Sequence, residues 1–188
     1  MKPRLPLALG VAAWAVALGA GMAWAQQHAA RPGEPAAAPL RWPSQSRLAR
    51  GPGPQLIVFA HPECPCSRAS LRELERLLGS NPGRRAAVVF ASSGAAPVAG
   101  SPLWAQASAI AGVTAIDDRG GVEARLFGAA TSGTALLFDE AGALRFRGGL
   151  TQSRGHEGDT PGKAALAALL GGLPAPTAGT PVFGCSLF

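Results

Sequence analysis

The chain has 188 residues, enough for one domain of ordinary size plus an appendage, and it carries a formal net charge of +6. Nucleic-acid-binding proteins concentrate basic side chains on one face or in a recognisable motif. Here the basic residues are spread along the chain and aromatic residues make up only 6% of it, so nucleic-acid binding is not expected. A mild attraction to anionic membrane surfaces fits the charge better.

The N-terminus combines a short basic segment, residues 1–4, with an uncharged apolar stretch at residues 5–25. A helix of about 20 apolar residues spans a bilayer, and positive charge before it keeps the N-terminus in the cytoplasm. The rest of the chain is then exported. Ala23-Trp24-Ala25 also matches a signal-peptidase site. Two outcomes stay open: a soluble periplasmic protein after cleavage at Ala25, or a signal anchor in the bacterial inner membrane with the domain facing the periplasm. The length of the apolar run and the bulky Trp24 favour the anchor.

Residues 26–54 are rich in proline, alanine and glycine and have no sustained hydrophobic period. This composition predicts a flexible tether. We expect the folded domain at residues 55–173 and a tail at residues 174–188 that carries Cys185.

The most informative stretch lies where this domain begins. Residues 56–60 form an apolar, β-branched run typical of a buried strand, and leucines further on recur on one helical face. Between them lies Cys64-Pro65-Cys66. Proline suits the first helical position, so Cys64 is the expected N-cap and Cys66 the second residue of the helix. The pattern Ser70-x-x-Glu73 offers a later alternative start.

Both thiols would then lie at a helix N-terminus, where unpaired N–H groups and the helix dipole stabilise an anion. Cys64 should have a lowered pKa and act as the nucleophile. Arg68, one turn on, and protonated His61 would add to this effect. The alternative is a pair of inert, buried cysteines.

The remaining elements follow in an order typical of a parallel β-α-β unit extended by a hairpin. Asp117 and Asp118 end a short strand, and we interpret them as helix-capping or solvated carboxylates, with a general base as the alternative. The predicted strands are 86–91, 113–116, 134–138 and 143–147, and the predicted helices are 102–111, 122–127 and 163–170.

A strand followed by a cysteine pair that opens a helix resembles the thioredoxin-like fold, a mixed sheet flanked by helices. The protein resembles the small bacterial proteins called RedB in the sequence of residues 61–70 and in residues 148–159 and 183–188. The RedB proteins are thioredoxin-like and usually carry an N-terminal membrane segment. Two departures from the thioredoxin pattern stand out. The cysteines are separated by one residue rather than two, and Gly133 occupies the position of the usual cis-proline.

The resemblance directs attention to a polar loop and to the third cysteine. In a thioredoxin-like layout, residues 153–159 can lie near the active-site end of the sheet. His156 would then shuttle a proton or bind a metal, and Arg154 would stabilise a thiolate; a polar surface loop is the alternative. Cys185 is the odd cysteine. A docked tail would let it resolve a disulfide, whereas a Cys64–Cys66 ring would be small and strained.

The leading prediction is thiol–disulfide exchange with protein thiols or disulfides in the periplasm, without a cofactor. Cys64 would attack, and Cys66 or Cys185 would resolve. A thiol peroxidase would use the same nucleophile, but its Thr-and-Cys signature is missing. The alternative from another class is a copper chaperone that binds Cu(I) through Cys64, Cys66 and His156, since soft thiolates and imidazole suit that ion. A redox-inert binding module is a third possibility.

Overall fold

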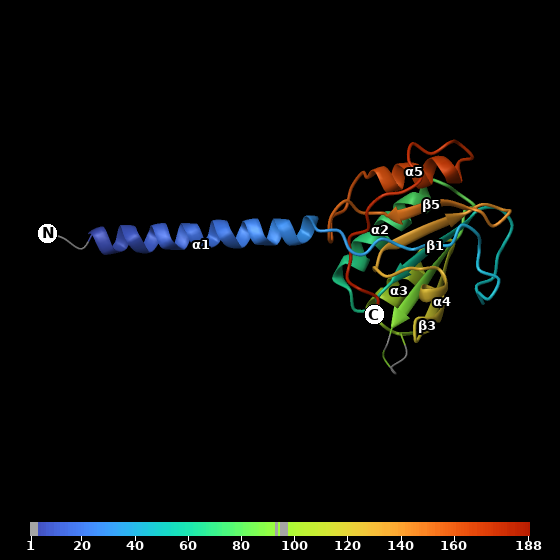
Figure 1. Ribbon diagram of the computed structural model, residues 1–188, viewed down its shortest axis with the longest axis horizontal. Coiled ribbons are helices and arrows are strands. Elements are labelled where there is room, and N and C mark those ends of the chain that lie inside the picture. Colours follow the sequence, from blue (N-terminus) through green and yellow to red (C-terminus); the bar gives the residue numbers. More distant parts are fainter. Residues whose placement is uncertain (1–3, 93, 95–97) are drawn as a thin grey trace.

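The computed structural model describes residues 4–92, 94 and 98–188. Helix α1 (Arg4–Ala30) extends away from the rest of the molecule, and its apolar side chains from residue 7 onward are exposed (Figure 1). The helix continues five residues beyond the predicted apolar run. It is long and apolar enough to cross a membrane, a test that a signal sequence at the N-terminus also passes.

The domain is built on a mixed five-stranded sheet with the order β3-β2-β1-β4-β5. Strand β1 pairs in parallel with β2 and antiparallel with β4, while β2 pairs in parallel with β3 and β4 antiparallel with β5. The predicted α/β class, a mixed sheet flanked by helices, is therefore confirmed. The strands are β1 (Gln55–Ala60), β2 (Ala86–Ser92), β3 (Val113–Arg119), β4 (Thr134–Phe138) and β5 (Leu144–Gly149).

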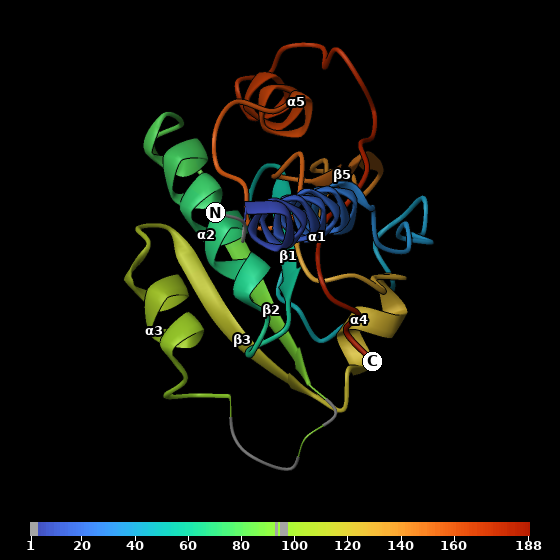
Figure 2. The same ribbon diagram turned by 90° about the vertical axis from the view of Figure 1, so that its left-hand side faces the viewer.

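Helices cover both faces of this sheet, as the view along α1 shows (Figure 2). The apolar sides of α2 (Pro65–Gly79), α3 (Pro102–Ala109) and α5 (Pro161–Leu170) form one core layer with alternate residues of the strands. The short helix α4 (Val122–Leu126) lies on the other face, where its buried side chains and the remaining strand residues form a second core layer. Because neighbouring strand residues point to opposite faces, both layers draw on β1.

The segment between α1 and β1 is packed against the domain. Ala36, Ala38 and Leu48 are buried in the second core layer, and the ring of Trp42 lies 5.0 Å from that of Phe127. The predicted flexible tether is corrected here: the segment has no helix or regular strand, but its small and aromatic side chains cover the sheet face that α4 leaves open. The composition of this segment shows that it has no hydrophobic period, but it does not show that these side chains are buried.

The start of α2 follows the earlier of the two predicted positions. Cys64 is the N-cap, with an extended backbone, and Pro65 is the first helical residue. The later start at Ser70 was wrong. Strand β3 is three residues longer than predicted and includes both aspartates. The Asp118 carboxylate accepts from the backbone N–H groups of Glu123 and Ala124 at 3.0 and 2.9 Å, which confirms its interpretation as a helix-capping residue.

Candidate thiol site

Strand β1 leads the chain directly to Cys64. The strand lies in the middle of the sheet, and a tight turn joins its end to α2, with the Cys64 N–H donating to the His61 carbonyl oxygen at 3.2 Å. At the first turn of α2 the Ser67 N–H donates to the Cys64 carbonyl oxygen at 3.0 Å. The nucleophile predicted from sequence therefore lies at the junction of the central strand and a helix.

The C-terminal tail reaches the same place by pairing with residues 130–132. The Ser132 N–H donates to the Cys185 carbonyl oxygen at 2.8 Å, and the Leu187 N–H donates to that of Ala130 at 2.9 Å. The Leu187 side chain is buried in the second core layer. The expectation that the tail docks on the domain is confirmed.

Gly184 makes this close approach possible. A Cβ atom at this position would lie 1.9 Å from the backbone oxygen of Ser132, well inside any real contact. The absence of a side chain at residue 184 therefore lets the tail bring Cys185 into the site.

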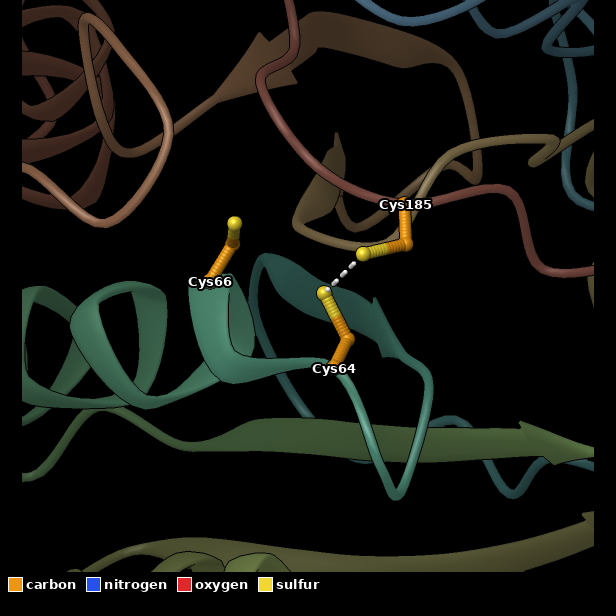
Figure 3. A group of neighbouring side chains, drawn as sticks. All are labelled: Cys64, Cys66 and Cys185. Carbon is orange, nitrogen blue, oxygen red and sulfur yellow. Dashed lines mark hydrogen bonds between the residues drawn. The ribbon is translucent and has the colours of Figure 1, made fainter. Parts of the chain in front are cut away.

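The sulfur atoms of Cys64 and Cys185 point toward one another at 2.9 Å, a hydrogen-bond contact between thiols (Figure 3). Cys66 lies beside them in the first turn of α2, and the three sulfur atoms are all within 4.8 Å of one another. Cys64 is buried, while Cys66 and Cys185 are half-buried. Three thiols from two segments 119 or more residues apart thus form one cluster (185 − 66 = 119).

The environment separates the acidities of Cys64 and Cys185. Burial raises the pKa of Cys64, but hydrogen bonds from the Cys185 thiol and backbone and from Ser67 outweigh it and lower the pKa to about 7. Burial raises the pKa of Cys185 to about 12, with the hydrogen bond to Cys64 and the charge of its thiolate acting in the same direction. Of this pair, Cys64 is the thiolate and Cys185 the thiol donor.

Cys66 responds mainly to burial and to its neighbour. Both burial and the negative charge of Cys64 raise its pKa, whereas the nearby Arg154 guanidinium lowers it. At neutral pH Cys66 is therefore the weaker nucleophile of the two cysteines in this motif.

Two buried serines, which the sequence did not single out as site residues, hold the Cys64 turn in place. The Ser132 hydroxyl lies 2.7 Å from that of Ser67 and accepts from the His61 N–H at 2.9 Å. It thereby joins the chain before β4 to the start of α2. The available signal was weak: Ser67 stands three residues after the N-cap, and Ser132 directly precedes Gly133.

Gly133 lies where the resemblance places a cis-proline. Its φ is +92°, and its N–H donates to the Phe59 carbonyl oxygen at 2.7 Å. No cis peptide bond occurs in residues 4–92, 94 and 98–188. The expected departure from the thioredoxin loop is thus visible as a left-handed glycine.

Arg154 lies in the site, as the resemblance implied. Its Nη1 donates to the Gly184 carbonyl oxygen, next to Cys185, and its Nε is buried without a hydrogen-bond partner among the described residues. Arg154 therefore contacts the tail and lies close enough to Cys66 to lower its pKa.

Among the described residues, no hydrogen bond joins the side chains of the other predicted supporting residues to the three thiols. The His61 ring accepts from the Glu63 N–H at 3.2 Å, and the carbonyl oxygen of Arg68 accepts from the Gln106 side chain at 3.3 Å. His156 is exposed and is not part of the group of potential ligands that contains the three cysteines. The copper ligand set of Cys64, Cys66 and His156 is therefore not brought together, and the third potential ligand beside the two cysteines is Cys185.

A buried carboxylate fixes the loop that carries Arg154. Glu73 is fully buried in α2 and accepts from Lys163 Nζ at 2.8 Å and from the Gly158 N–H at 2.9 Å. Burial raises the pKa of Glu73, but these bonds and the charges of Lys163 and Arg76 outweigh it and hold the pKa below its ordinary value. The sequence indicated Glu73 only as part of a possible helix-capping pattern with Ser70.

Comparison with known proteins defines the fold class. No protein-family model and no curated protein matches the sequence. A hypothetical protein from Sinorhizobium meliloti 1021 is 21% identical with a TM-score of 0.60, over 84% of this chain and 93% of that one. An uncharacterized conserved protein from Geobacillus kaustophilus is 21% identical with a TM-score of 0.57, over 84% of this chain and 92% of that one. At this identity the likeness establishes a shared fold. The chain is an α/β protein with three clustered thiols where its central strand meets a helix.

Proposed function

We propose that the protein performs thiol–disulfide exchange, with Cys64 as the attacking residue and Cys185 as the resolving residue. The observation that carries this proposal is the 2.9 Å contact between two sulfur atoms whose pKa values lie at about 7 and about 12. A disulfide requires the two sulfur atoms to approach by about 0.9 Å, to a bond length near 2.05 Å. We also propose that the domain is thioredoxin-like and that the protein is related to the RedB-like proteins.

In this exchange, atoms and electrons balance between the protein and its client. The Cys64 thiolate attacks one sulfur of a client disulfide, whose other sulfur leaves as a thiolate and takes up a proton. Cys185 then loses its proton to solvent or to the departing client and attacks the sulfur of Cys64, releasing the first client sulfur. The client gains two electrons and becomes a dithiol, while Cys64 and Cys185 become a disulfide. The same steps in reverse oxidise a client dithiol.

The electrostatics of the pair support this order of events. The thiolate charge on Cys64 is one cause of the raised pKa of Cys185. When Cys64 enters a mixed disulfide, that charge disappears, so the pKa of Cys185 falls at the step where its thiolate is required. Cys66 would instead close a small, strained ring with Cys64, which disfavours it as the resolving residue.

We place this activity at the outer face of the bacterial inner membrane, with α1 retained as the anchor. The basic segment before the apolar run supports an exported domain. The alternative is a soluble periplasmic protein produced by cleavage at Ala25.

A redox titration of the full chain in detergent tests the proposal. The metal-free protein is equilibrated in graded thiol–disulfide buffers, its thiols are trapped by alkylation, and bridged peptides are mapped by mass. We expect one two-electron transition that links Cys64 to Cys185 and leaves Cys66 free. Cys66→Ser should retain the transition, whereas Cys185→Ser should remove it. Three free thiols across the whole series would contradict the proposal.

Binding of Cu(I) is the second candidate, because three thiolates within 4.8 Å suit a soft ion. Cys185 replaces His156 in this version of the site. Competition for Cu(I) against a chromogenic chelator then distinguishes the variants: Cys185→Ser should weaken binding at least tenfold, and His156→Ala should leave it unchanged. Equal affinity in the parent and Cys185→Ser would remove this candidate.

A further inference from the structure

The end of α1 is attached to the thiol site by a single residue of the polar loop. The Arg154 N–H donates to the carbonyl oxygen of Ala29, in the last turn of α1, at 2.9 Å. The guanidinium of the same residue donates to the Gly184 carbonyl oxygen, directly before Cys185. Arg154 therefore links the apolar helix to the tail that carries the resolving thiol.

The chain that follows α1 runs along the same site. The Gly33 N–H donates to the Val182 carbonyl oxygen at 2.8 Å, and the Thr131 hydroxyl donates to the carbonyl oxygen of Glu34 at 2.8 Å. A Cβ atom on Gly33 would lie 2.5 Å from the Thr131 side chain, so this approach is close. Because residues 33 and 34 contact both the tail and the loop that pairs with it, no free tether separates α1 from the thiols.

These contacts set the height of the site above a bilayer. The apolar run ends at Ala25, and Ala29 follows four residues later, a rise of about 6 Å along a helix. The headgroup layer on each side of the hydrocarbon core is about 5–8 Å thick. The Arg154 backbone thus lies at the outer edge of the headgroups, and the C-terminus lies on the side of the domain from which α1 emerges (Figures 1 and 2).

We propose that the client of Cys64 is an integral membrane protein whose reacting cysteine pair lies at the outer surface of the same bilayer. This inference rests on the proposed thiol–disulfide exchange and on retention of α1. The contacts of Arg154 and Gly33 hold the tail that carries Cys185 close to the end of α1, so with α1 in a bilayer the thiols would lie near the surface from which segments of other membrane proteins emerge. A freely diffusing periplasmic protein would have to enter between the domain and the lipid.

The height of the site is measured first, without any redox chemistry. The full chain with Cys64→Ser and Cys185→Ser carries a fluorophore on Cys66 and is placed in phosphatidylcholine vesicles containing lipids with a spin-labelled headgroup. The control replaces all three cysteines with serine and carries the fluorophore at Ala141→Cys. Ala141 is exposed in the β4–β5 turn, beyond the start of β1, whereas the thiols lie beyond its end.

Headgroup spin labels should quench the Cys66 fluorophore several-fold more than the Ala141→Cys fluorophore. Equal quenching at the two positions would overturn the inference, because the site would then lie no closer to the lipid than the opposite end of the sheet. This readout does not depend on whether the protein exchanges disulfides.

The client class is tested with designed transmembrane peptides in the same vesicles. Each peptide carries one cysteine in a mixed disulfide with a small thiol, either three or 25 residues beyond its apolar span. The reduced wild-type chain should reduce the near peptide at least tenfold faster than the far one. A matched variant with 20 glycine and serine residues inserted between Ala30 and Arg31 should lose this preference.

The outcomes separate the inference from the function on which it rests. Equal rates for the two peptides, together with reduction of a small soluble disulfide, would overturn the membrane-protein client and indicate a freely diffusing one. Failure to reduce even the soluble disulfide would overturn the proposed exchange, and this inference with it, whatever the quenching shows.

Discussion

The acidity of Cys64 should depend on the docked tail. The thiolate accepts a hydrogen bond from Cys185 at 2.9 Å, and this bond is the largest of the effects that lower its pKa to about 7. A hydrogen bond to a charged group contributes about 1.5–3 kcal/mol, which corresponds to about 1–2 pKa units. Loss of the Cys185 side chain would also admit water, weakening the burial that raises the pKa. We therefore expect Cys185→Ala to raise the pKa of Cys64 by about one unit.

Alkylation kinetics provide the assay. In a Cys66→Ser background, the rate at which iodoacetamide modifies Cys64 is followed by mass from pH 5 to 9, with and without Cys185→Ala. The rate should fall as the pH drops through about 7 in the parent. At pH 7 half of the parent would be thiolate, against about one tenth in the variant, a loss of about fivefold in reactive fraction.

A donor-preserving control isolates the cause. Cys185→Ser retains a hydroxyl that can donate to the thiolate, so its profile should lie closer to the parent than that of Cys185→Ala. Midpoints that agree within 0.3 pH units for all three proteins would refute the reasoning, because the low pKa would then come from the helix N-terminus, Ser67 and the Cys185 backbone without the Cys185 thiol.

Three further substitutions probe the supporting structure. Gly184→Ala should lower the yield of the Cys64–Cys185 disulfide by at least tenfold in a redox buffer, because the added Cβ would lie 1.9 Å from a backbone oxygen. The control Gly51→Ala, whose Cβ has space, should leave the yield unchanged. Ser132→Ala removes the hydroxyl partner of buried Ser67 and the acceptor of the half-buried His61 N–H, and it should cost about 1–3 kcal/mol of unfolding free energy in urea. Glu73→Gln breaks a buried ion pair with Lys163 and should cost about 3 kcal/mol at pH 7. Since the pKa of Glu73 is lowered, its contribution is present above its ordinary value of 4.5 and disappears as the pH falls through the folded pKa, so parent and variant should converge in acid.

The start of α2 shows what local sequence determines. Pro65 can occupy only the first turn without losing a hydrogen bond, and the leucines that follow recur on the face that the sheet buries. Both facts are contained in a dozen consecutive residues, so the position of Cys64 could be predicted. The same local reasoning failed for residues 31–54, where burial depends on a distant sheet face rather than on a period in the segment itself.

The partner of Cys64 shows where local sequence stops being informative. Cys185 and His156 were both candidates for the third position, and nothing within either segment distinguishes them. The choice depends on antiparallel pairing between the tail and residues 130–132 and on the missing side chain at Gly184. Ser132, which connects this pairing to the first turn of α2, could be recognised only after the two segments had been brought together.

Because a hydrogen bond from the docked tail lowers the pKa of Cys64, the proposed exchange would be coupled to tail docking. The helix N-terminus is present whether or not the tail is bound, whereas the hydrogen bond from Cys185 exists only when residues 184–187 lie on the loop before β4. A client that displaced the tail would remove this bond and raise the pKa of Cys64. In the proposed exchange, a mixed disulfide at Cys64 would remove the thiolate charge that raises the pKa of Cys185, so the redocked tail would bring a more acidic Cys185 to the disulfide that it attacks. In the proposed exchange, the segment that activates the nucleophile would thus be the same segment that ends the reaction.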